Sequence, residues 1–166
     1  MAAGQPQFGN RPLSDCPWQA WFDGAAAPNP GPMGLGARLV GPDGQARELS
    51  LRPGLSGCNN EAELLALEAL LELALTLGVQ RLVVRGDSDF VIRHLRGEAS
   101  TAVPHLALLL QRVGARLAAF EAVQLLWVPR HRNNDADRLS RSALGLSTEP
   151  APRPISRTQS RSRRRS

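Results

Sequence analysis

The stretch Trp18-Gln19-Ala20-Trp21-Phe22-Asp23-Gly24 places a carboxylate at the end of an apolar run that contains two tryptophans. Such a run is typical of a buried strand, so a strand is predicted over residues 17–23. A carboxylate at the end of that strand costs free energy unless a positive group meets it. Asp followed by Gly is also typical of a turn, and for Asp23 alone the turn is the better interpretation. Further acids along the chain change that balance.

Beyond this strand the sequence predicts strands and helices that follow one another closely. Residues 34–41 and 45–52 are predicted to pair as a hairpin, since Pro42-Asp43-Gly44 between them is a typical turn. The segment PGLSGCNN after the hairpin is predicted as a loop. The remaining predicted elements are helix 60–77, strand 82–84, helices 88–96 and 104–120, strand 123–128, loop 129–133 and helix 134–144. Hairpins followed by helical crossovers predict an α/β fold, a mixed sheet with helices on both faces.

The length of the chain, 166 residues, suits one domain with a sizeable core, which we place at residues 17–146. Residues 1–16 and the Arg/Ser-rich tail 147–166 are predicted to be disordered because of their polar composition. No apolar run is long enough for a membrane span, and residues 1–16 carry no signal pattern. Cys16 and Cys58 have neither disulfide nor zinc spacing. We interpret them as free thiols, which favours a cytoplasmic protein.

Charge divides the chain at Pro150. Up to that residue, fourteen arginines and fifteen acidic residues give a net charge of −1, and no lysine is present. The six arginines beyond Pro150 give the tail a charge of +6. Nucleic-acid binding by the folded part therefore has to rest on a local site rather than on net charge.

The predicted helix 60–77 carries acids on two different faces. Glu61, Glu68 and Glu72 recur with helical spacing and are predicted to face solvent. Glu63 lies about 200° around the helix from Glu61, among the leucines predicted to pack on the sheet. The helix therefore has one acid on its buried side, in its first turn.

Four acids now stand out: Asp23, Glu63, Asp87 after the apolar run Leu82-Val83-Val84, and Asp137 in the last helix. Singly, each has an ordinary explanation as a turn residue, a helix cap, a partner of the helix dipole or a surface acid. Together, four carboxylates at one end of a sheet repel one another unless cations share them. Ligands that are all oxygen suit Mg²⁺ or Mn²⁺.

Four motifs carry a family resemblance: FDGAAAPNPGP with GLGARL after it, CNNEAELLALEALL, VRGDSDFVI and WVPRHRNNDADRLSRSAL. Their identities and order resemble type 1 ribonuclease H (ribonuclease HI), over Trp18 to Leu144. The resemblance implies a ribonuclease H-like fold with a mixed five-stranded sheet whose first three strands are antiparallel. It also implies an enzyme that hydrolyses the RNA strand of RNA–DNA hybrids with two Mg²⁺ ions, Mn²⁺ being a substitute, and leaves 5′-phosphate and 3′-hydroxyl ends. We expect a monomer.

Carried over by position, the metal-binding and catalytic acids are Asp23, Glu63, Asp87 and Asp137. The resemblance implies that Asp23 bridges the two metals, that Glu63 and Asp87 complete one metal site, and that Asp137 completes the other. Helix phase by itself favours Glu63 over Glu61. It does not separate Asp137 from Asp135, and there only the family pattern decides.

The resemblance also implies roles for residues around the acids. His131, in the loop before the last helix, is a candidate for proton transfer and product release. The alternative is a solvated loop histidine without a role in catalysis. Asn59 and Asn60 carry amides suited to the minor groove, where 2′-hydroxyls mark RNA; for Asn60 a helix N-cap is a serious alternative. The full set of predicted substrate contacts is Gly24, Asn29, Cys58, Asn59, Asn60 and Asp89.

Two departures from the family pattern bear on substrate affinity. The span from Asp87 to Asp137 is too short for the basic protrusion of some members, which predicts a compact form. Cys58 stands where many members have a threonine next to a phosphate. The Arg-rich tail is a candidate for contacts with phosphates.

Two other functions compete with this one. The first is a non-catalytic module that binds RNA or hybrids, which the presence of all four acids disfavours. The second is another nuclease of the superfamily, such as a junction resolvase or an exonuclease. The spacings in CNNEAE and DADRLS argue against it.

Overall fold

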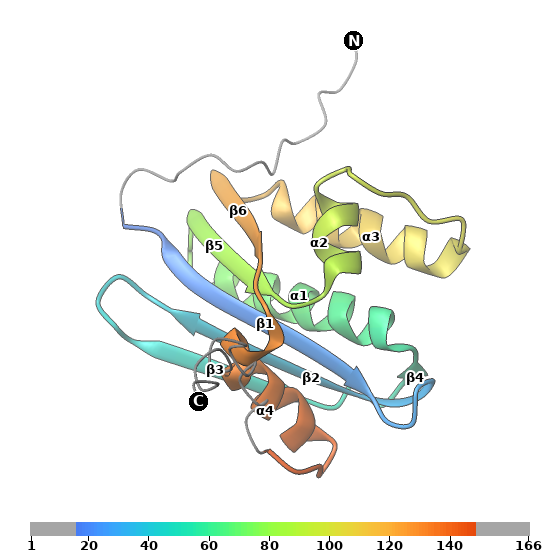
Figure 1. Cartoon of the computed structure of the whole chain (residues 1–166). Helices are drawn as coiled ribbons and strands as arrows, with labels where there is room; N and C mark the ends of the chain where they lie inside the picture. The colour runs from blue at the N-terminus through green and yellow to red at the C-terminus, as the bar shows by residue number, and fades with distance from the viewer. Residues whose placement is uncertain (1–15, 149–166) are drawn as a thin grey trace, which may run out of the picture.

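The computed structural model describes residues 16–148, and they form a mixed sheet flanked by helices (Figure 1). The strands run in the order β3-β2-β1-β5-β6. Antiparallel pairing joins β1 (Trp18–Ala26), β2 (Gly31–Val40) and β3 (Ala46–Leu51), and parallel pairing joins β1, β5 (Arg81–Gly86) and β6 (Ala122–Trp127). The predicted mixed sheet with three antiparallel strands at its start is confirmed. The disorder predicted for residues 1–16 and 147–166 falls almost wholly outside the described residues.

One short strand was not predicted. Ser56 and Gly57 form β4 and pair with Pro32 and Gly31 of β2, so part of the expected loop PGLSGCNN belongs to a sixth strand. The pairing brings the start of the following helix close to the end of β1.

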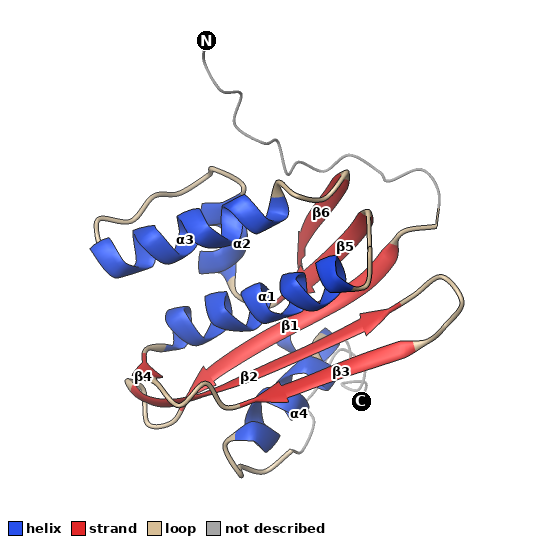
Figure 2. Ribbon diagram, turned by 180° about the vertical axis from the view of Figure 1, so that it is seen from behind, coloured by secondary structure: helices blue, strands red, loops and turns tan. Residues whose placement is uncertain are grey.

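Helices cover the sheet unequally, as the two opposite views show (Figures 1 and 2). One face carries α1 (Asn59–Thr76), α2 (Asp89–Leu95) and α3 (Pro104–Leu117). The other face carries α4 (Asn134–Ala143), which packs on β1, β2 and β3. A 3-10 turn, η1 (Arg130–Arg132), occupies part of the predicted loop 129–133. No helix in the described part of the chain is long and apolar enough to cross a membrane.

The first strand runs further than predicted. β1 continues through Asp23 to Ala26, because Asp23 and Gly24 keep pairing with Gly36 and Leu35 of β2. The placement of Asp23 at a strand end is therefore wrong. Its carboxylate projects from within the strand and is buried.

The predicted solvent face of α1 is also partly wrong. Glu68 is buried, because α3 packs beside α1 and covers the flank that carries this residue. The guanidinium of Arg112 donates to both Glu68 oxygens, at 2.5 and 3.0 Å, and Arg116 lies 3.4 Å away. Charged residues on one face of a helix usually indicate a solvated face. Here one of them pairs with arginines of a second helix.

Candidate active site

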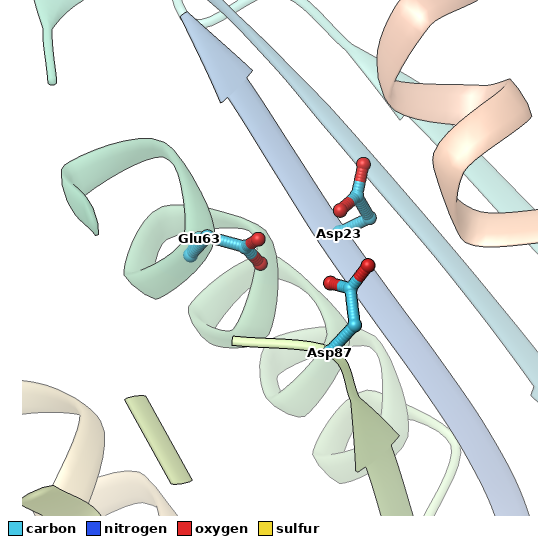
Figure 3. A group of neighbouring side chains, drawn as sticks. All are labelled: Asp23, Glu63 and Asp87. Atoms are coloured by element: carbon cyan, nitrogen blue, oxygen red, sulfur yellow. The ribbon is translucent and has the colours of Figure 1, made fainter. Parts of the chain in front are cut away.

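Three carboxylates from different elements converge at one point (Figure 3). Asp23 comes from β1, Glu63 from the first turns of α1, and Asp87 directly follows β5. Each offers an oxygen, and these oxygens lie within 4.8 Å of one another. Because β1 and β5 are neighbouring parallel strands, Asp23 and Asp87 lie side by side towards the carboxyl ends of these strands.

Gly24 allows Glu63 to reach this cluster. A Cβ at position 24 would lie 2.1 Å from the carbonyl carbon of Ala62, so only glycine lets α1 pack this closely on β1. The Gly24 amide donates to Glu63 Oε2 at 3.2 Å. Glu61 points elsewhere and pairs with His105 of α3 at 2.6 Å. The prediction from helix phase that Glu63, not Glu61, faces the sheet is confirmed.

Asp137 approaches the cluster from the opposite side, on α4. It is buried, and its Oδ1 lies 3.4 Å from Nη2 of Arg130. Asp135, the alternative that helix phase left open, has a side chain 59% exposed and lies 3.9 Å from the guanidinium groups of Arg38 and Arg138. The structure thus separates the two acids by burial, and Asp137 is the one that faces the cluster.

The four acids surround a cavity of about 430 Å³. Its wall consists of Asp23, Gly24, Ala25, Asn59, Glu63, Asp87, Trp127, Arg130, Asp137 and Arg141. Four acids and two arginines contribute to this wall, and such charged side chains suit a charged ligand.

Burial and mutual repulsion disfavour ionisation of these acids. Burial raises the pKa of Asp23 to about 7; a hydrogen bond from Ser140 opposes the rise, and Asp87 and Asp137 add to it. Burial, then the charges of Asp23 and Asp87, raises the pKa of Glu63 well above its usual range. Burial also raises the pKa of Asp87, against a backbone hydrogen bond and Arg130. A cation among these oxygens would offset both the cost of burying the charges and the repulsion between them. The all-oxygen donor set fits Mg²⁺.

Sequence reasoning missed several residues that support the acids. Ser140, one turn after Asp137 on α4, donates from its hydroxyl to Asp23 Oδ2. Asn133 is buried and donates to the Phe22 carbonyl at 2.9 Å. The Trp127 indole donates to the Asp87 carbonyl at 3.2 Å. Helical spacing from Asp137 was the one available signal for Ser140; the other two depend on tertiary contacts.

Two of the predicted substrate contacts, Gly24 and Asn59, line the cavity. Asn59 is held from two sides: its side-chain Oδ1 accepts from the Ala26 backbone amide at 2.9 Å, and its backbone amide donates to Asn29 Oδ1 at 3.1 Å. Asn29 therefore connects the β1–β2 loop to the start of α1. The N-cap alternative for Asn60 is wrong, because Cys58 occupies the cap position, without a side-chain cap bond.

The other predicted contacts lie off the cavity wall as the described residues define it. Asp89 is exposed at the start of α2, 3.7 Å from Arg93. His131 lies in η1, half-buried, and its carbonyl accepts from the Asn134 amide at 2.9 Å. Cys58 and Asn60 are half-buried at the start of α1.

A sheet in the order β3-β2-β1-β5-β6, with acids from its two central strands and from a helix on each face, defines a ribonuclease H-like α/β protein. Comparison with known proteins narrows this class. The Reverse transcriptase-like family matches residues 21–143. Ribonuclease HI of Halobacterium salinarum is 36% identical over 143 residues, which cover 86% of this chain and 69% of that protein.

Solved structures agree with these sequence relatives. The crystal structure of RNase H1 from Halobacterium salinarum superposes with a TM-score of 0.70 at 36% identity, over 77% of this chain and 97% of that one. The N-terminal RNase H domain of a Mycobacterium tuberculosis protein gives 0.70 at 30% identity, over 79% and 95%. LC11-RNase H1, isolated from compost and solved in complex with an RNA/DNA hybrid, gives 0.71 at 26% identity, over 77% and 96%.

The chain belongs to the ribonuclease HI family. It matches only 36% of the length of a bifunctional protein from Mycobacterium tuberculosis, with 32% identity, so that relative contains much that this chain does not match.

Proposed function

We propose that the chain is an endoribonuclease that hydrolyses the RNA strand of RNA–DNA hybrids. The observation that carries the proposal is the convergence of Asp23, Glu63 and Asp87 within 4.8 Å, with Asp137 on the same cavity wall. Membership of the ribonuclease HI family and the likeness to an RNase H1 solved with an RNA/DNA hybrid support the choice of substrate. A binding module without catalysis has no need of four clustered acids, whose repulsion lowers stability.

The proposal includes two Mg²⁺ ions, with Mn²⁺ as a substitute, and products with 5′-phosphate and 3′-hydroxyl ends. Asp23, Glu63 and Asp87 would hold one ion, and Asp23 and Asp137 the other. Bound there, the ions supply Lewis-acid stabilisation of charge on the phosphate and favour ionisation of the attacking water.

The chain's own residues orient this chemistry. Gly24 donates its amide to Glu63 and keeps β1 and α1 close, while the Trp127 indole fixes the backbone at Asp87. Arg130, with a side chain 62% exposed, faces the cavity beside Asp137. Its guanidinium can bind a phosphate next to the acids. Asn59 sits at the rim with its amide held by Ala26, in reach of a sugar edge.

The test is cleavage of an end-labelled RNA–DNA hybrid in Mg²⁺, in Mn²⁺ and in EDTA, beside single-stranded and duplex RNA. We expect metal-dependent cleavage of RNA in the hybrid alone, 5′-phosphate and 3′-hydroxyl ends on the products, and no cleavage by Asp23→Asn. Cleavage of free single-stranded RNA at a comparable rate would contradict the substrate assignment. Tight binding of the hybrid without any cleavage would favour the non-catalytic module.

Three accompanying proposals concern the whole protein: that it is monomeric, that it is cytoplasmic, and that the Arg-rich tail contacts substrate phosphates. They rest on the sequence, and the tail lies outside the described residues. Gel filtration tests the first proposal, fractionation of the source cell tests the second, and deletion of the tail tests the third.

A further inference from the structure

Ser140 is fully buried between α4 and the sheet, at a place that two glycines of β2 make possible. A Cβ on Gly36 would lie 2.4 Å from the Ser140 amide nitrogen, and a Cβ on Gly34 2.3 Å from the Ser140 carbonyl oxygen. Gly36 is also the residue that pairs with Asp23 across the β1–β2 ladder. Close packing of backbone on backbone therefore fixes the serine directly over Asp23.

The Ser140 hydroxyl contacts the carboxylate of Asp23 on β1 and the backbone carbonyl of Asp137 on its own helix. It donates to Asp23 Oδ2 and lies 2.9 Å from the backbone carbonyl of Asp137. One hydroxyl has a single proton, and a carboxylate is the stronger acceptor. The hydroxyl therefore restrains the orientation of the Asp23 carboxylate. Figure 3 shows one Asp23 oxygen turned towards Glu63 and Asp87 and the other turned away.

An ordinary packing role accounts less well for these contacts. Serine in a helix commonly bonds a carbonyl one turn back, and the Asp137 carbonyl fits that description. Alanine would fill the same space with better helix propensity and no buried hydroxyl. The contact with Asp23 is the feature that only a hydroxyl provides.

We propose that Ser140 is a positioning residue that orients the Asp23 carboxylate for divalent-cation binding. The inference rests on the proposed function of the cluster as a metal site. Outer partners of metal ligands commonly change metal affinity by an order of magnitude when they are removed. Ser140 would then act through Asp23, without touching substrate.

The test compares Ser140→Ala with Ser50→Ala. Ser50 is a matched control, because its hydroxyl also bonds α4, at the Leu139 carbonyl (2.8 Å), but contacts none of the four acids. Mn²⁺ binding is measured by calorimetry without substrate, and kcat and KM for a hybrid are measured across Mg²⁺ concentrations. We expect Mn²⁺ affinity to fall about tenfold in Ser140→Ala and to stay unchanged in Ser50→Ala. The kcat of Ser140→Ala should fall at low Mg²⁺ and recover at high Mg²⁺, with KM for the hybrid unchanged.

A double variant shows whether Ser140 acts through Asp23. In an Asp23→Asn background, Ser140→Ala should cause no further loss of Mn²⁺ affinity; a further tenfold loss would overturn the inference. Unchanged Mn²⁺ affinity in Ser140→Ala, or an equal loss in Ser50→Ala, would also overturn it. Circular dichroism and thermal unfolding of each variant establish that the fold persists. Weakened Mn²⁺ binding in Ser140→Ala, in a protein that cuts no hybrid, would support the inference and refute the proposed nuclease.

Discussion

At Asp23 the folded protein holds a carboxylate where burial disfavours its charge. Burial raises its pKa from 3.8 to about 7, so between these values the folded state keeps a proton that the unfolded state releases. The contribution of Asp23 to the stability of the metal-free protein therefore falls as pH rises from about 4 to about 7. Above pH 7 this contribution stays low. The proposed binding of a divalent cation would offset this cost by favouring the ionised carboxylate.

We therefore predict that Asp23→Asn stabilises the metal-free protein in a pH-dependent way. The gain should be small near pH 4 and reach at most about 4 kcal/mol above pH 7, as the pKa shift implies. Urea unfolding in EDTA at a series of pH values measures it. Asp135→Asn, an exposed acid two residues from Asp137, is the control and should change stability little. A gain that does not grow with pH would contradict this account.

Glu63 and Glu61 provide a second comparison at the scale of single residues. Glu63 accepts from the Gly24 amide inside the cluster, whereas Glu61 pairs with His105 on the outer side of α1. We predict that Glu63→Gln lowers kcat at least about a thousandfold, since it removes a metal-binding charge, and that Glu61→Gln leaves kcat within about threefold. Steady-state cleavage of a hybrid measures both. Equal losses would show that the side of α1 that serves the site has been misassigned.

At the scale of elements, the site depends on how closely α1 approaches β1. The Cβ of Gly24→Ala would meet the Ala62 carbonyl carbon at 2.1 Å and the Glu63 nitrogen at 2.4 Å, and neither backbone can move alone. We predict that Gly24→Ala destabilises the fold by about 3 kcal/mol or more and displaces Glu63. Gly114→Ala is the control, since nothing lies within 4 Å of its added Cβ and it sits inside α3. That variant should gain up to about 1 kcal/mol.

Both glycine variants can be followed by thermal unfolding and by hybrid cleavage. Gly24→Ala should unfold at a markedly lower temperature and lose activity, while Gly114→Ala should keep full activity. A Gly24→Ala protein as stable and active as the wild type would show that α1 is free to shift away from β1.

Sequence patterns predicted the strands and helices well wherever an element has one clear hydrophobic periodicity. They predicted the hairpin, the strand ending before Asp87 and the side of α1 that carries Glu63, because each depends on local alternation or helix phase. They failed at Glu68, which helix phase gave to solvent but which α3 covers. A single helix cannot reveal that a second helix lies across it.

The candidate site shows the same division. Its acids could be proposed from motifs, but helix phase did not separate Asp137 from Asp135, which differ in burial in the folded protein. Ser140 and Asn133 could not be proposed, because their partners Asp23 and Phe22 lie more than a hundred residues away in sequence. Contacts of this kind exist only in the folded chain.

At the scale of the whole molecule, the sequence up to Pro150 has no net positive charge to attract a polyanion. Only residues 96–103 separate α2 from α3, so no basic protrusion extends from the described structure. Residues up to Pro150 carry a net charge of −1, and the proposed site itself is acidic. Arg130 and Arg141 on the cavity wall are local exceptions. A basic segment elsewhere in the chain would add to the affinity for a hybrid.

The Arg-rich tail is the one strongly basic segment of the sequence, with six arginines after Pro150. Guanidinium groups bind phosphates without regard to sequence, and each neutralised phosphate releases counterions. We predict that deletion of residues 150–166 raises KM for a hybrid several-fold at low salt and leaves kcat nearly unchanged. The dependence of log affinity on log salt should become shallower by at most about 5, if each arginine neutralises one phosphate. A control chain with the six tail arginines replaced by serine keeps the length and removes the charge. It should behave like the truncated chain. If both proteins match the full chain in KM and in salt dependence, the tail has no part in binding substrate.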